Sequence, residues 1–145
     1  MTMMRCWQPV TTLMVAMCLL LAGCVKESGW EQAMQALKDD PMTSASWEGL
    51  ELTSHEETSN EGHKPKPPSI TRCYKMTIPP EKAFSKVIET AQKHGWTEET
   101  GVRTKESALA GKTINNALAS LILSTRSGVC DPSFDPQFRI TINYR

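Results

Sequence analysis

The chain has few aromatic residues and no net charge, and both features limit the kinds of partner that it can bind. Aromatic residues make up 6% of the 145 residues, and 16 Lys and Arg side chains balance 16 Asp and Glu. Without clustered positive charge we expect no nucleic-acid partner, since displacement of the counterions of nucleic acid needs Lys and Arg. Trp30, Trp47 and Trp96 could line a ligand cleft, but in so small a domain we expect them to complete the core.

The chain also lacks the residue patterns on which catalysis depends. No serine lies in a G-x-S-x-G turn, and the acids are scattered rather than paired. A nucleophile needs a base and an orienting group, yet the chain has only three histidines. His94 closes a predicted helix, where an imidazolium would interact favourably with the terminal carbonyls. We therefore predict no enzyme and no cofactor.

One group of residues has the types that bind metal ions. Imidazole and carboxylate groups suit borderline metals such as zinc. These residues lie, however, in a segment rich in Glu, Ser, Thr and Asn that predicts a solvated loop with nothing to hold ligands in place. We therefore predict no metal site at this group, which comprises His55, Glu56, Glu57, Glu61 and His63.

No apolar run is long enough to span a bilayer. The run at 13–22 is about half of the ~20 residues that a crossing helix needs. Arg5 precedes it, and small residues close it, which is the pattern of a signal peptide. The run ends in Leu21-Ala22-Gly23-Cys24, which resembles the lipobox of bacterial lipoproteins. An ordinary secretory signal cut elsewhere and a short uncleaved anchor are the alternatives.

The lipobox resemblance implies cleavage before Cys24 and a diacylglycerol on its sulfur, with a third acyl chain in many bacteria. Two or three chains hold a protein stably at a membrane. Residues 1–23 would then be the signal peptide and residues 24–29 a tether. Val25 follows the cysteine at the position where Asp would act as an inner-membrane retention signal. We therefore expect the lipid to lie in the outer membrane of a two-membrane host, or in the cell membrane of a single-membrane host.

Two cysteines remain once this processing is taken into account. Cys6 and Cys18 belong to the signal segment, and Cys24 would carry lipid. Cys73 and Cys130 then form a single pair in an oxidising compartment, which predicts a disulfide. A redox-active pair or a metal role are the alternatives, but the two cysteines are not in a C-x-x-C arrangement.

The first half of the remaining chain predicts two helices and two strands around a polar loop. Apolar residues recur at helical spacing near the start and again after two prolines, where Gly95 ends the second helix. Residues 54–69 are polar and then proline-rich, which predicts a solvated loop. The expected elements are a helix at 30–37, strands at 46–53 and 70–78, and a helix at 80–94.

The second half predicts strands. Residues 98–104 and 107–114 are two candidates, and Asn115-Asn116 is a plausible tight turn into a third at 117–125. Residues 114–123 could also be helical, although we favour the hairpin. Strict alternation at 138–145 predicts the last strand of an antiparallel sheet with one wet face.

These elements predict an α+β fold for residues 30–145. We expect an antiparallel sheet of four to six strands, with the helix at about 80–94 packed on one face and one disulfide. The order of a cysteine-bearing strand, an amphipathic helix, a hairpin and Ser127-Gly128-Val129-Cys130 resembles small uncharacterised lipoproteins of actinobacteria over residues 45–145. That resemblance implies an extracytoplasmic domain without a known activity.

The hypothesis that follows is a lipid-anchored binding or interaction module of the bacterial cell envelope. Its partners would be the membrane, through the lipid on Cys24, and an envelope protein. The alternative is an envelope-anchored inhibitor or exclusion protein that blocks a cell-wall hydrolase or phage. Residues 54–69 or 126–136 would then enter the blocked site.

Overall fold

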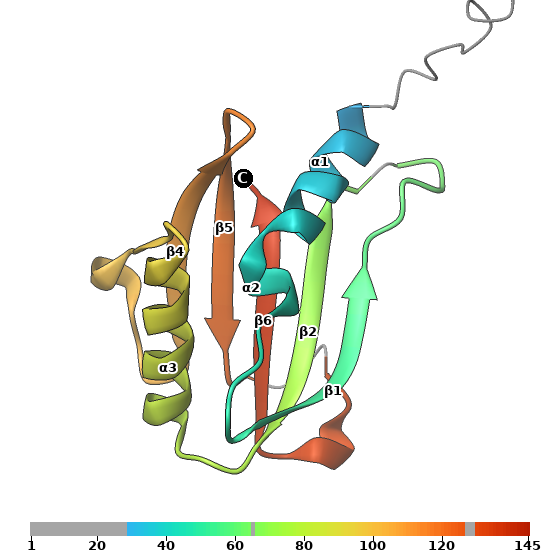
Figure 1. Cartoon of the computed structure of the whole chain (residues 1–145). Coiled ribbons are helices and arrows are strands. Elements are labelled where there is room, and N and C mark those ends of the chain that lie inside the picture. The colour runs from blue at the N-terminus through green and yellow to red at the C-terminus, as the bar shows by residue number, and fades with distance from the viewer. Residues whose placement is uncertain (1–28, 65, 127–129) are drawn as a thin grey trace, which may run out of the picture.

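A computed structural model describes residues 29–64, 66–126 and 130–145. These residues form one six-stranded antiparallel sheet in the order β1-β2-β6-β5-β4-β3, with three helices on one face (Figure 1). The predicted α+β class and antiparallel sheet are thus confirmed. The helices are α1 (Gly29–Asp39), α2 (Pro41–Ser44) and α3 (Pro80–Lys93), and the strands are β1 (Leu50–Glu57), β2 (Ser69–Met76), β3 (Thr97–Glu98), β4 (Ser107–Ile114), β5 (Ala117–Ser124) and β6 (Gln137–Tyr144).

The core lies between the helices and the inner face of the sheet. In β6 the alternate residues Phe138, Ile140 and Ile142 are buried, whereas Arg139 and Thr141 face the open side. This strand pairs with β2 on one side and β5 on the other, so its apolar face is at the centre of the sheet. The strict alternation in the sequence therefore predicts this central strand correctly.

The helix predicted at 80–94 is present as α3. Pro80 opens it, where a missing N–H costs nothing, and Gly95 follows it with φ +85°. Its apolar side packs on the sheet, and the Phe84 ring meets the Phe138 ring edge-on at 5.1 Å between centroids. The boundaries agree with the prediction within one residue.

The N-terminal helix is longer than predicted, and a second helix follows it. Asp40 ends α1 and also caps α2, because its side chain accepts a hydrogen bond from Met42 N at 3.0 Å. Pro41 occupies the first turn of α2. The sequence predicts the Asp40-Pro41 step only as the end of a helix, whereas the same step also starts α2. Both helices lie on the same face as α3.

Residues 107–124 form the predicted hairpin, and the helical alternative is wrong. β4 pairs with β5 over their full length from Ser107–Ser124 to Ile114–Ala117. Asn115 and Asn116 have φ of 50° and 63°, the left-handed pair that a type I′ turn requires.

Two other predictions need correction. The strand expected at 98–104 is only the two-residue β3, because the chain turns into a short 3-10 helix at Thr100–Val102. The strand expected at 46–53 is β1, displaced to Leu50–Glu57 with a bulge between Leu52 and Ser54. The loop predicted at 54–69 consequently begins only after Glu57.

The shortened loop is also not fully solvated. Pro68 is buried, and the indole of Trp30 donates a hydrogen bond to Lys66 O at 2.7 Å. Thr58 Oγ1 donates to Pro67 O at 3.0 Å. Its proline-rich half is therefore anchored to α1 and to the end of β1.

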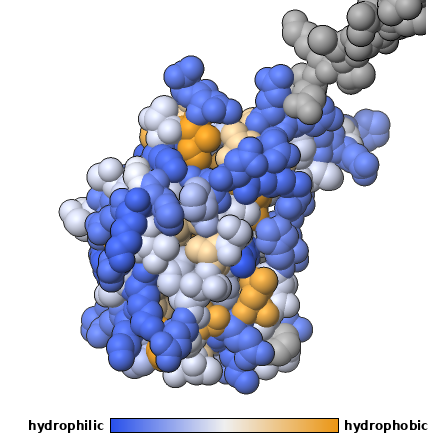
Figure 2. All heavy atoms as spheres, in the orientation of Figure 1, coloured by the Kyte–Doolittle hydropathy of each residue, from blue (hydrophilic) through white to orange (hydrophobic). Residues whose placement is uncertain are grey.

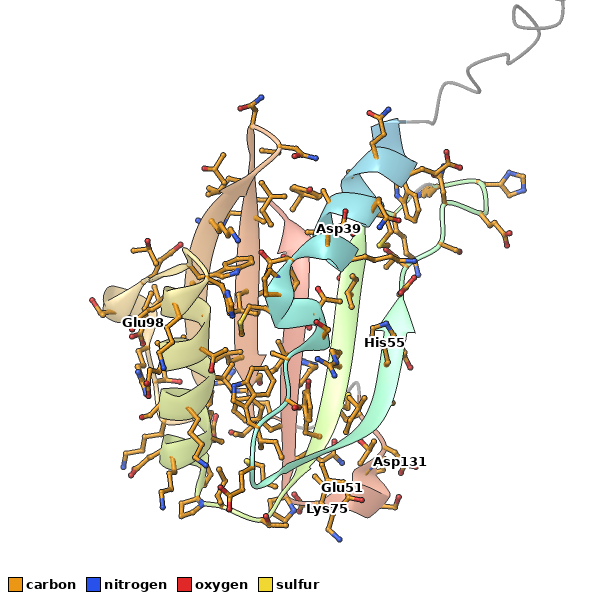
Figure 3. The ribbon with its side chains drawn as sticks, viewed as in Figure 1. Asp39, Glu51, His55, Lys75, Glu98 and Asp131 are labelled. Atoms are coloured by element: carbon orange, nitrogen blue, oxygen red, sulfur yellow. A yellow bond between two sulfur atoms is a disulfide. The ribbon has the colours of Figure 1, made fainter. Side chains whose placement is uncertain are left out.

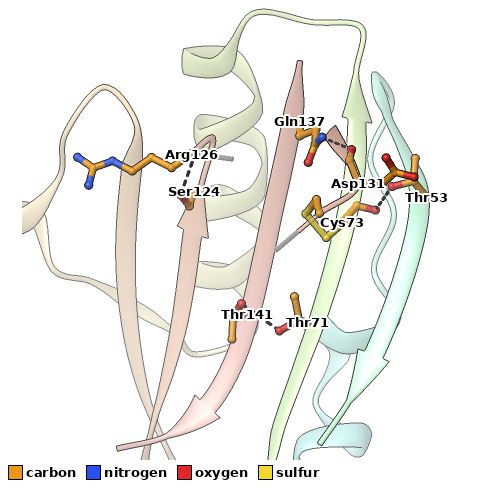
Figure 4. The surroundings of a disulfide bond; sticks show 9 residues. Thr53, Thr71, Cys73, Ser124, Arg126, Asp131, Gln137 and Thr141 are labelled. Carbon is orange, nitrogen blue, oxygen red and sulfur yellow. Dashed lines mark hydrogen bonds between the residues drawn. A yellow bond between two sulfur atoms is a disulfide. The ribbon is translucent and has the colours of Figure 1, made fainter. Parts of the chain in front are cut away.

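The predicted disulfide is present on the open face of the sheet. Cys73 of β2 bonds to Cys130, with 5.8 Å between their Cα atoms. Figure 4 shows the bond on the side of the sheet away from the helices, beside the Thr71–Thr141 hydroxyl pair. It ties the centre of the sheet to the segment that contains the second 3-10 helix (Pro132–Phe134).

Candidate functional site

A shallow, open hollow in the described part of the chain lies between α1 and the end of the β4–β5 hairpin that carries its turn. It has a volume of about 530 Å³ and continues into a smaller hollow of about 210 Å³ toward the start of α1. Figure 2 shows a small hydrophobic patch in this region, surrounded by hydrophilic atoms. We call it the α1–hairpin groove; its lining includes Gln32, Gln35, Ala36, Asp39, Asp40, Pro41, Lys112, Thr113, Ile114 and Asn115.

One wall of the groove is the polar side of α1. Met34 and Leu37 of this helix are buried, so Gln32, Gln35 and Ala36 face away from that buried side. Ala36 is small, which leaves room above the sheet. The end of β4 and the hairpin turn form the other side, and the groove is open to solvent.

The floor of the groove is an ion pair between a buried carboxylate and a partly buried lysine. Lys112 Nζ lies 2.7 Å from Asp40 Oδ2, and it is placed 5.8 Å from the centroid of the Trp96 ring. The Trp96 indole donates a hydrogen bond to Asp40 Oδ1 at 3.2 Å. Lys112 stands at an inward position of β4, whose other inward residues Ala108 and Ala110 are buried and apolar.

Asp40 is engaged by three groups of the protein itself. Asp40 is 5% exposed, and its two oxygens accept bonds from Lys112, Trp96 and the backbone of Met42. Three of the roughly four acceptor positions of this carboxylate are thus used within the protein. The ion pair therefore joins α1 and α2 to β4 and shapes the groove.

The groove offers groups that recognise an extended polar ligand. Gln32, Gln35 and Asn115 carry carboxamides, each of which both donates and accepts hydrogen bonds. Gln35 is held by a 2.8 Å hydrogen bond to Asp39. Such groups match a peptide backbone or a sugar chain, which also presents donors and acceptors alternately.

Sequence reasoning missed Asp40 and Lys112, and each had a signal. Asp before Pro is the usual start of a helix, with the acid as cap and the proline in the first turn. Lys112 interrupts the alternation of small apolar residues in its strand. A charge at an inward position needs a partner, so the two residues belong together on physical grounds.

The predicted metal-type residues are only partly brought together. His55 Nε2 lies 3.2 Å from Glu57 Oε1, whereas Glu56 alternates to the other face of β1. Lys38 Nζ lies 2.6 Å from Glu57 Oε2, and this hydrogen bond lowers the pKa of Glu57. Glu61 and His63 are exposed in the loop beyond β1. No group of three metal-binding side chains occurs among the described residues.

The three tryptophans belong to the core and its margin. Trp96 is buried, and Trp30 and Trp47 pack against the core. Trp47 also meets the Tyr74 ring edge-on at 6.0 Å between centroids. His94 is exposed at the end of α3, where its backbone N–H donates hydrogen bonds to the carbonyl oxygens of Ala91 and Gln92.

The predicted lipid site Cys24 and the Ser127-Gly128-Val129 motif lie outside the described residues, as do the predicted signal peptide and most of the predicted tether. None of the helices that the structure describes has the length and apolarity that a membrane crossing requires. Comparison of the chain with protein-family models, curated proteins and solved structures gives no match.

Proposed function

We propose that the protein is a lipid-anchored, extracytoplasmic binding module of the bacterial cell envelope, and that the α1–hairpin groove is its binding site. The anchor rests on Leu21-Ala22-Gly23-Cys24 after a short apolar run. The binding role rests on one structural observation, which is the polar groove along α1.

The distance between the lipid and the domain is short. Five residue steps separate Cys24 from Gly29, so even a fully extended tether spans no more than about 18 Å. The start of α1 and the turn of the β4–β5 hairpin lie at one end of the domain (Figure 1). The groove would therefore be held near the membrane surface, where a ligand attached to the envelope is concentrated.

The anchor is tested by a pair of cysteine variants. Cys24→Ser should leave the protein unprocessed or release it from the membrane fraction, because serine offers no thiol for the thioether. Cys18→Ser, six residues earlier in the apolar run, should leave attachment unchanged. A cleaved, lipid-labelled Cys24→Ser protein would contradict the proposed anchor.

The groove is tested by photo-crosslinking in cells. A photoreactive residue at Gln35 or at Asn115, on the two sides of the groove, should give the same adduct. The same group at Glu89 on the exposed side of α3 serves as the control. Ala36→Trp should fill the groove and abolish the adduct. An adduct equally strong from Glu89, or one that survives Ala36→Trp, would place binding elsewhere.

A second proposal, an inhibitor or exclusion protein, rests on the segment around Cys130. This segment lies at the end of the domain away from the start of α1 (Figure 1), and the disulfide holds it to β2. Ser133 N donates a hydrogen bond to Asp131 Oδ1, which lowers the pKa of Asp131. A crosslink from Ser133 to one enzyme, with none from Gln35, would favour this alternative.

A further inference from the structure

Arg72 is a buried cation without an acidic partner. It is 8% exposed and points to the helix side of β2, between the buried residues Ile70 and Tyr74. Of the ion pairs found among the described residues, none includes it. A charge taken out of water without compensation costs several kcal/mol, so this position needs an explanation.

The neighbours of Arg72 do not supply that compensation. Opposite it stand His55 on β1 and Ile140 on β6, and α2 above it has no charged residue. The acid on the same face of β1, Glu57, is already engaged by Lys38 and His55. The aromatic face of Tyr74 lies 5.3 Å from the guanidinium carbon and provides a weak negative potential.

One edge of the guanidinium remains unused. Nη1 donates to Ala45 O at 2.9 Å, whereas Nε is buried and has no hydrogen-bond partner. No bond from Nη2 to another described residue accompanies it. The Nε and Nη2 hydrogens point in parallel, which is the fork that a carboxylate fills with its two oxygens.

A second unpaired donor lies two residues further along the same face. The hydroxyl of Tyr74 is buried without a partner, and burial raises the pKa of Tyr74 to about 12. The hydroxyl therefore keeps its proton at neutral pH and can donate. Two unpaired donors on one face are more consistent with a missing acceptor than with an apolar contact.

The open side of this position is β1, the edge strand. Leu52, opposite Tyr74, is 46% exposed, and the side chain of His55, opposite Arg72, is 38% exposed. Figure 3 shows His55 on the helix-bearing side of β1, and Figure 2 shows a hydrophobic spot beside this strand. A ligand approaching from β1 would meet an apolar side chain first and the cation behind it.

We propose that Arg72 is a carboxylate-binding residue, and that it takes a ligand whose free carboxylate stands next to an apolar group. The apolar group would rest on Leu52 while the carboxylate pairs with the Nε and Nη2 edge. This site is separate from the α1–hairpin groove, and it stands or falls independently of the proposed lipid anchor.

The test is a titration of the full chain in a non-ionic detergent, followed by the NMR signal of the Arg72 Nε–Hε group. N-acetyl-leucine is the probe, because it joins a carboxylate to an isobutyl group, and its uncharged amide is the control. We expect a saturable shift with the acid and none with the amide. Loss of a charge-assisted hydrogen bond of about 1.5–3 kcal/mol corresponds to roughly 10–100-fold weaker binding. Arg72→Leu should therefore bind at least tenfold more weakly.

Two further variants keep the test decisive. Arg72→Lys retains the charge but not the fork, and it should also lose most of the affinity. Arg139→Leu removes a half-buried arginine from the open face of the sheet and should change nothing. An Nε–Hε signal that N-acetyl-leucine leaves unchanged would overturn the proposal and assign the unpaired edge to bound water. An equal shift with inorganic phosphate would show a general anion site and overturn the carboxylate preference.

Discussion

At the scale of single residues, Asp40 combines more roles than any other side chain in the groove. It caps α2, accepts the Trp96 indole and pairs with Lys112. Removal of one partner from a buried ion pair destabilises a protein strongly, because the remaining charge loses its compensation. Lys112 is partly buried, since 25% of its side chain is exposed.

We therefore expect Asp40→Ala to lower the free energy of unfolding by about 3–4 kcal/mol. Asp39→Ala is the matched control, because Asp39 is exposed and bonds only Gln35 within its own helix. Its effect should stay within about 0.5 kcal/mol. Urea unfolding measures both. Equal effects of the two variants would show that the ion pair does not hold α1 to β4.

Tyr74 makes stability depend on alkaline pH. An ordinary tyrosine has a pKa near 10, and burial raises the pKa of Tyr74 to about 12. The unfolded chain thus loses this proton first, so stability is complete below pH ~10 and falls as the pH rises toward ~12. The expected loss from this group is about 2–3 kcal/mol.

The Tyr74→Phe variant isolates this contribution. It lacks the titrating hydroxyl, so its free energy of unfolding should fall less than that of the wild type between pH 9 and 12. A remaining decrease is expected from Tyr144, whose pKa burial also raises. At neutral pH the variant should be as stable as the wild type or more so, because the hydroxyl has no partner. Identical pH profiles for both proteins would contradict this account.

At the scale of elements, the turn before β1 depends on a glycine. Gly49 has φ +88°, and a Cβ there would lie 2.5 Å from Ile78 Cγ2. Gly49→Ala should therefore destabilise the protein by about 1–3 kcal/mol. Gly101→Ala is the control, since Gly101 has no atom within 4 Å of that position. Thermal unfolding compares the two, and a Gly49→Ala protein as stable as the control would refute the contact.

The elements also show which parts of the fold are readable from sequence. β6 and α3 have unbroken periodicity, and Asn115-Asn116 marks its turn, so all three are predicted correctly. β1 is misplaced because its residues past Leu52 are polar and charged, as on many edge strands, so composition alone suggests a loop. The groove could not be predicted, because it depends on α1 lying beside the hairpin in the folded chain. Asp40 and Lys112, which meet there, are 72 positions apart in the sequence.

At the scale of the whole molecule, one disulfide joins the centre of the sheet to the segment that follows β5. Cys73 and Cys130 are 57 positions apart, and closure of such a loop disfavours the unfolded chain by about 4 kcal/mol in the chain-entropy model. The double variant Cys73→Ala/Cys130→Ala should lose about that much stability. Cys6→Ala should lose none. A loss below about 1 kcal/mol in urea unfolding would contradict a structural role for the bond.

The central claim is that the folded domain is held at a membrane by lipid on Cys24. The most direct measurement is the mass of the N-terminal peptide of the protein purified from bacterial membranes. We predict a peptide that begins at Cys24 and carries the added mass of a diacylglyceryl group, with or without a third acyl chain. A peptide that begins elsewhere, or one with an unmodified Cys24, would contradict the claim.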